Sequence, residues 1–145
     1  MSRMLWVILV LLCATASMIL AADPKDDAKA MDGVWIAKSA ELGGQPMAAD
    51  TVKTIKLEMK AGKYTVTVGQ AVDRGTVKYG STKKPKTMDI AGDDGPNKGK
   101  TFLAIYELSG DSLKVCYDLS GTSRPTEFKT AGTKLFMATY QREPR

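Results

Sequence analysis

Four tyrosines are the side chains of this sequence best suited to contact a ligand. They fall in four separate segments in which apolar and polar residues alternate: Tyr64, Tyr79, Tyr106 and Tyr117. Each combines an apolar ring with a hydroxyl that donates or accepts a hydrogen bond. If Tyr64, Tyr106 and Tyr117 face one interior, they could orient a small apolar or amphipathic molecule. The alternative is that the rings only fill the interior of the domain.

Arg124 and Glu127 are the second candidate pair, in the motif RPTEF (124–128) of the longest expected loop. At the mouth of a domain, Arg124 could bind an anion while Glu127 orients it. We favour an architectural alternative, in which Arg124 pairs with a carboxylate or with backbone carbonyls. Phe128 would then plug the core.

The composition excludes several kinds of catalytic and metal site. The chain has 145 residues, no histidine and two cysteines, so it cannot form a Ser-His-Asp triad, a Cys-His pair or a histidine-ligated metal centre. Asp93, Asp94 and Asn97 do not have the spacing of a calcium-binding loop. No two acidic residues fall inward on neighbouring strands, as hydrolysis of glycosides requires. We therefore predict a protein that is not an enzyme and has no metal or cofactor.

Lysines are concentrated in two successive connections, and the sequence has a formal net charge of +5. Lys83, Lys84 and Lys86 belong to one connection, and Lys98 and Lys100 to the next. Together they could form a basic rim for acidic polysaccharides, phosphate or membrane headgroups, or simply a solvated surface. We expect no nucleic-acid partner, because the sequence has no motif of stacking aromatic residues.

Residues 1–22 have the pattern of an export signal. Arg3 precedes an uncharged stretch at 4–22, and small residues allow cleavage after Ala16 or, closer to the polar boundary, after Ala22. The stretch is also long enough for an uncleaved membrane anchor, and Cys13 could carry a lipid although a bulky residue precedes it. All three alternatives place the remaining chain outside the cytoplasm, in the periplasm or the extracellular space.

Cleavage after Ala22 would leave Cys116 as the only cysteine, so the exported chain would have no intrachain disulfide. Its stability would then depend on an apolar core, in which we expect Cys116 to pack as a small hydrophobic side chain. Residues 23–32 are polar and small, and they form either a tether or a short helical turn.

From residue 33 onward the pattern is that of β-strands. In 54–60, for example, Ile55, Leu57 and Met59 alternate with polar residues, which gives the strand one apolar face. Turn residues separate such segments. We predict one helical turn at 47–53 and eight strands, at 33–42, 54–60, 63–68, 74–79, 87–91, 100–108, 112–118 and 133–142.

Successive strands joined by short turns predict an antiparallel sheet. Eight strands are enough for such a sheet to close on itself, and closure removes the unpaired edges. We therefore predict an all-β domain over 33–142, an antiparallel eight-stranded up-and-down β-barrel, either round or flattened. Two sheets packed as a sandwich are the alternative.

Two of the predicted strands are apolar on both faces. In 102–108 and 134–140 hydrophobic residues occupy successive positions, which indicates that their outer faces are also covered. The cover could be the helical turn, the N-terminal segment or a second subunit. A face left free would suit self-association or another envelope protein.

Several segments of the sequence resemble a lipocalin-like domain family that is abundant in planctomycete bacteria. The first is Gly33-Val34-Trp35, which is similar to the G-x-W signature of lipocalins. The others are KKPKTMDI (83–90), GPNKGKTFLAIYELSGDSLKVCYD (95–118) and RPTEF (124–128). The similarity extends from Gly33 to about Arg142.

This resemblance implies a fold more than a function. It implies a small exported lipocalin-like barrel whose biochemical role is not established. In lipocalins, a tryptophan of the first strand packs at the closed end of the barrel beneath an arginine of the last strand. The resemblance therefore implies that Arg142 stacks on Trp35, which is a structural contact between a cation and an indole ring.

We predict that this domain binds a small apolar or amphipathic ligand in the cell envelope without catalysis. That function requires an internal cavity of about 300 Å³ or more. The alternative is a protein–protein interaction or structural module of the envelope, which would use the apolar outer faces of its strands.

Overall fold

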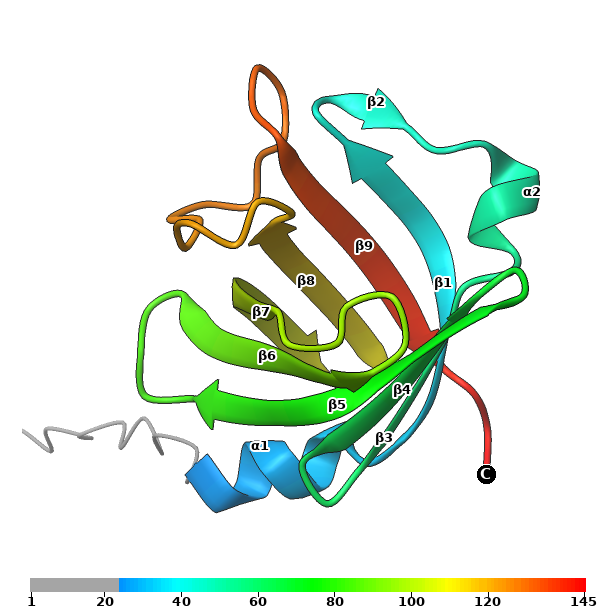
Figure 1. The fold of residues 1–145 in the computed structure, drawn as a ribbon. Helices are drawn as coiled ribbons and strands as arrows, with labels where there is room; N and C mark the ends of the chain where they lie inside the picture. The colour runs from blue at the N-terminus through cyan, green and yellow to red at the C-terminus, as the bar shows by residue number, and fades with distance from the viewer. Residues whose placement is uncertain (1–23) are drawn as a thin grey trace, which may run out of the picture.

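A computed structural model describes residues 24–145, and most of them belong to one closed antiparallel barrel (Figure 1). Its eight strands are β1 (Gly33–Leu42), β3 (Lys56–Lys60), β4 (Lys63–Val68), β5 (Ala71–Gly80), β6 (Lys86–Asp94), β7 (Thr101–Ser109), β8 (Ser112–Asp118) and β9 (Leu135–Arg142). Each strand pairs with the next, and β9 pairs with β1 to close the ring. The short β2 (Gln45–Pro46) folds back on the end of β1. The predicted eight-stranded up-and-down barrel is confirmed, and the β1–β9 pairing excludes the sandwich.

Two short helices accompany the barrel. Helix α2 (Ala49–Val52) lies within the predicted helical turn at 47–53. Helix α1 (Pro24–Met31) occupies the segment for which a tether and a helical turn were the two possibilities. The export signal predicted at 1–22 lies outside the described residues.

Connections alternate between the two ends of the barrel, because neighbouring strands run in opposite directions. We name the end that carries α1 and the turns 61–62, 81–85 and 110–111 the closed end. The other end carries α2 and the connections 69–70, 95–100 and 119–134, and we name it the open end.

This arrangement contradicts the basic rim considered from the sequence. The connection with Lys83 and Lys84 lies at the closed end, whereas Lys98 and Lys100 lie at the open end, with the length of β6 between them. Successive connections of an up-and-down barrel are always at opposite ends, so the two groups of lysines cannot form one surface. Lys86 is engaged in an ion pair with Asp27 at 2.8 Å.

The closed end is built around Trp35 and Arg142. Trp35 is fully buried, and the Arg142 guanidinium lies 4.1 Å from the centre of its ring. The Trp35 Nε1–H donates to the Met31 carbonyl at 2.9 Å, while Arg142 donates to the carbonyls of Asp32, at 2.6 Å, and Ala30. The last carbonyls of a helix lack partners within the helix. Trp35 and Arg142 supply those partners, and so they hold α1 against the barrel.

An outer layer covers part of β7 and β8. Ile105 and Cys116 face each other across these strands and point away from the barrel interior, yet they are only 1% and 0% exposed. Connection 119–134 lies against this face, where Arg124 Nη1 donates to the Ala104 carbonyl at 2.7 Å. Among residues 24–145, the chain's own loop is therefore a cover of this face, which the sequence did not predict.

Phe128 belongs to this outer layer, so its predicted place in the core is wrong. It is half-buried, and the outward-facing Lys114 places its Nζ 5.6 Å from the centre of the ring. The backbone N–H of the adjacent Lys129 lies near the Cys116 thiol and partly offsets the rise in its pKa that burial causes. Phe128 thus packs against the outside of β8.

We expect the Arg142→Ala substitution to lower the free energy of unfolding by about 2–4 kcal/mol. It removes the donors to the end of α1 and the cation over the Trp35 ring. Chemical denaturation followed by circular dichroism measures the change, and Arg145→Ala, at an exposed position, is the control. An Arg142→Ala protein as stable as this control would contradict the role given to Arg142.

Candidate functional site

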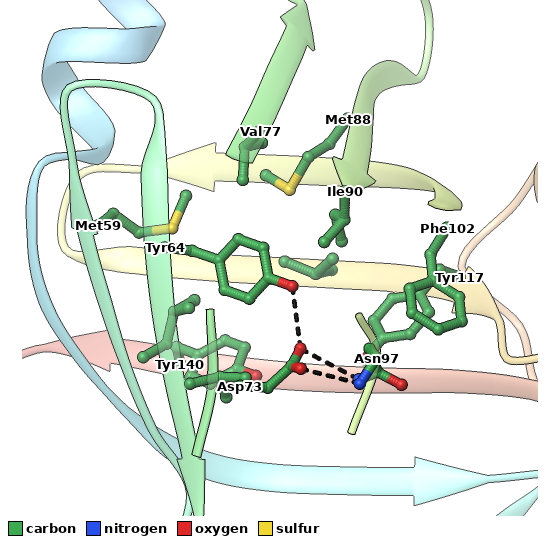
Figure 2. Close-up of a pocket in the computed structure, with 13 residues that line it drawn as sticks. Met59, Tyr64, Asp73, Val77, Met88, Ile90, Asn97, Phe102, Tyr117 and Tyr140 are labelled. Carbon is green, nitrogen blue, oxygen red and sulfur yellow. Dashed lines mark hydrogen bonds between the residues drawn. The ribbon is translucent and has the colours of Figure 1, made fainter. Parts of the chain in front are cut away.

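The interior of the barrel contains a small cavity of about 70 Å³. Aliphatic side chains line it together with four aromatic rings, those of Tyr64, Phe102, Tyr117 and Tyr140 (Figure 2). Large side chains such as Met59 and Met88 fill much of the remaining interior. The cavity predicted from the sequence, about 300 Å³ or more, is therefore too large. The observed space suits only a small molecule.

A polar cluster stands at the open-end side of this cavity. Asp73 of β5 is only 6% exposed, and it accepts the Tyr64 hydroxyl at 2.9 Å. It also accepts the Asn97 side-chain amide at 3.1 Å and the Asn97 backbone N–H at 3.0 Å. Figure 2 shows Tyr64 and Asn97 converging on the Asp73 carboxylate. The cluster joins β4, β5 and connection 95–100 around one buried acid.

The conformation of connection 95–100 turns Asn97 toward the barrel. Gly95 has a φ of +94°, and a Cβ there would lie 2.4 Å from the Val72 carbonyl oxygen. Inside the connection, the Lys98 N–H donates to the Gly95 carbonyl and the Lys100 N–H to the Asn97 carbonyl, at 3.1 and 3.0 Å. Only glycine combines this backbone conformation with so close an approach. The connection is thus a compact turn held against β5.

Tyr117 and Tyr140 line the cavity beside the polar cluster. Neither hydroxyl forms a hydrogen bond with another of residues 24–145. The Tyr117 ring packs between Phe102 and Phe136, with ring centres 5.4 and 5.3 Å away. These two hydroxyls are therefore available to a bound molecule.

Burial raises the pKa of every tyrosine in the sequence, namely Tyr64, Tyr79, Tyr106, Tyr117 and Tyr140. For Tyr117 the pKa rises to about 12, and the charge of Asp73 adds to the effect of burial. For Tyr64, burial is again the first cause, followed by the hydrogen bond to Asp73 and the charge of that carboxylate. The folded protein therefore favours neutral phenols.

The structure brings together only part of the ligand-contacting set predicted from the sequence. Tyr64 and Tyr117 both line the cavity. Tyr106 does not, because its hydroxyl donates to Asp27 of α1 at 2.6 Å, near the closed end. Its ring packs edge-on against Tyr79, with ring centres 5.8 Å apart.

Arg124 and Glu127 lie outside the barrel interior. The Arg124 guanidinium forms an ion pair with Asp89 at 2.5 Å and also donates to the Ala104 carbonyl. Glu127 is exposed. These contacts are those of the architectural alternative, in which Arg124 holds its loop to a carboxylate and a backbone carbonyl.

Asp73 and Asn97 are the interior groups that the sequence analysis missed. The predicted strand at 74–79 begins one residue after Asp73, whereas β5 begins at Ala71. Asp73 and Val77 are four residues apart on β5, so their side chains lie on the same face of the strand, which points inward. A strand predicted to begin at Ala71 would therefore have placed the acid in the core. The sequence pattern points to Asn97 only as a possible calcium ligand, because it follows Asp93 and Asp94.

In comparisons with known proteins, no protein-family model, curated protein or solved structure matches the chain. Among residues 24–145, no group of three or more potential ligands is arranged to hold a metal ion. In the same part of the chain, neither helix has the length and hydrophobicity needed to span a bilayer. The cavity and its polar cluster are therefore the features from which a function can be argued.

Titration of the tyrosines should show the effect of burial directly. Every phenol pKa is raised, so the buried neutral phenols favour the folded state. Their contribution to the free energy of unfolding is fully present below about pH 10 and is lost as the pH rises above that value. We expect no phenolate absorbance near pH 10 while the protein stays folded, followed by ionisation together with alkaline unfolding. The control is the same titration in denaturant, where all phenols should ionise near pH 10. A tyrosine that titrates there in the folded protein would contradict this account.

Removing the Asp73 side chain should destabilise the barrel. In Asp73→Ala, the Tyr64 hydroxyl and the two Asn97 donors lose their acceptor, so we expect a loss of about 2–4 kcal/mol in the free energy of unfolding. Denaturation monitored by circular dichroism gives the value. Asp50→Ala removes an acid whose side chain is 98% exposed and should change stability by less than about 0.5 kcal/mol. Equal losses in the two variants would show that the cluster contributes nothing specific.

Proposed function

We propose that this chain is an exported, non-catalytic barrel that binds one small amphipathic molecule in its interior cavity. The observation that carries this proposal is the mixed lining of the cavity, in which aliphatic and aromatic walls surround a single polar cluster. Ligand sites typically combine apolar walls with a few convergent polar groups. The cavity volume of about 70 Å³ limits the ligand to a small molecule.

A ligand would reach the cavity from the open end. Connection 95–100 lies across this end (Figure 1), and Asn97 is both part of the connection and part of the lining. The closed end is occupied by α1, which Trp35 and Arg142 hold in place. Connection 95–100 is tied to the barrel through Asp73 and through two backbone hydrogen bonds with Gly92 of β6, both at 2.9 Å. We propose that exchange of ligand needs a movement of this connection.

Export and family membership belong to the same proposal. Residues 1–22 supply the export pattern, which suits the periplasm or the extracellular space. The resemblance to the planctomycete lipocalin-like family is supported by the stacking of Arg142 on Trp35, since that contact involves the two residues the resemblance names.

The alternative, an interaction module that uses the outer faces of 102–108 and 134–140, has less support. Ile105 on the first of these faces is covered by the chain's own loop. The internal cavity has no comparable occupant among residues 24–145. We therefore prefer ligand binding in the cavity.

A cavity-filling variant tests the proposed function. Ile90 lines the cavity, so the larger ring of Ile90→Phe should occupy it. Three probes with the same branched four-carbon skeleton, isobutanol, isobutylammonium and isobutyrate, are tested by saturation-transfer NMR at millimolar concentrations. We expect at least one to bind the wild type and to lose most of its signal in Ile90→Phe.

The matched control is Thr76→Phe, which adds the same ring at a half-buried position next to inward-facing Val77 on β5. This variant should bind as the wild type does. Failure of all three probes to bind the wild-type protein, or equal binding by Ile90→Phe, would refute the proposed function.

A further inference from the structure

The charge of the cavity lining is negative and has no counterion. Asp73 is its only ionisable group other than the tyrosines, and no lysine or arginine belongs to the lining. Within residues 24–145, Asp73 forms no ion pair, and its hydrogen-bond donors are neutral groups of Tyr64 and Asn97. A buried carboxylate that lacks a cationic partner is costly. A cation in the cavity would lower that cost.

The Asp73 carboxylate also retains capacity for another donor. A carboxylate offers about four acceptor positions, and three are filled by Tyr64 and the two Asn97 donors. The remaining position can accept an N–H group from a ligand. The hydroxyls of Tyr117 and Tyr140, which have no partner among residues 24–145, can accept further donors of the same ligand.

Aromatic rings complete an environment suited to a cation. Tyr64, Phe102, Tyr117 and Tyr140 all line the space beside Asp73. The faces of such rings attract ammonium groups, and the attraction is stronger where water is excluded. The negative field of Asp73 reaches across this space, because its charge helps to raise the pKa of both Tyr64 and Tyr117.

We infer that the molecule held in this barrel is a small alkylammonium compound, bound through its charged nitrogen to Asp73 and through its alkyl group to the aromatic and aliphatic walls. This inference rests on the proposed function and names the chemical class of its ligand. The lining opposes an anion, since it offers only negative charge. It favours an amine over an alcohol of the same shape because only the amine compensates Asp73.

The test compares isobutylammonium with isobutanol, which has the same number of non-hydrogen atoms, by NMR titration at neutral pH. We expect the wild-type protein to bind isobutylammonium at least about tenfold more tightly, and isobutyrate most weakly. In Asp73→Asn, which keeps an acceptor for Tyr64, the affinity for isobutylammonium should fall about tenfold or more. The affinity for isobutanol should stay within about twofold, and Asp50→Asn should match the wild type for both probes.

A second variant protects the test against misfolding of Asp73→Asn. Phe102→Leu replaces one ring by an aliphatic side chain and should weaken isobutylammonium more than isobutanol. If isobutanol binds the wild type as tightly as isobutylammonium, the inference is overturned while the proposed function stands. The same holds if a folded Asp73→Asn keeps its amine affinity. If no probe binds the wild type, both are overturned.

Discussion

The contact between Arg142 and Trp35 is the interaction on which the barrel's closed end depends. Trp35 lies near the start of the first strand and Arg142 ends the last, and the two strands pair to close the ring. The same guanidinium bonds the end of α1 and pairs with Asp111 of the 110–111 turn at 3.1 Å. One side chain therefore joins the seam of the sheet, the capping helix and a neighbouring turn. Closure and capping are thus coupled.

Two buried acids perform parallel tasks at the two ends. Asp27 on α1 accepts the Tyr106 hydroxyl, and Asp73 accepts the Tyr64 hydroxyl; each acid is 6% exposed. Asp27 also has a cationic partner, Lys86. Asp73 has none among residues 24–145 and instead holds Asn97 of connection 95–100. This difference in partners is the reason we propose a charged ligand for the open end and not for the closed end.

Alternation along the chain was enough to predict the fold. The predicted inward set of the second strand, Ile55, Leu57 and Met59, lies in or against the core, because side chains of a strand alternate between its faces. Features set by connections were harder to predict. The prediction of a basic rim was wrong because connections that are successive in the sequence were treated as neighbours in space. The prediction of Phe128 in the core was wrong because a long loop gives no periodic signal.

The candidate site was predictable only in part, for the same reason. Tyr64 and Tyr117 lie on regular strands, and both were expected to face the interior. Tyr106 lies near the closed end, away from the cavity, and its hydroxyl bonds Asp27 of α1. This partner depends on the docking of α1, which no strand pattern predicts. Asp73 was missed through an error of three residues in the start of β5. Cavity volume depends on the packing of the whole interior, which no local pattern encodes.

Connection 119–134 also governs the redox behaviour of the barrel. Disulfide exchange requires a thiolate that an oxidant or a second thiol can approach. Burial raises the pKa of Cys116, and the loop leaves this sulfur no exposed surface. The Cys116 thiol is therefore protected from oxidants and from other thiols while the loop is in place. Connection 119–134, and not the sheet, thus determines whether this thiol can react.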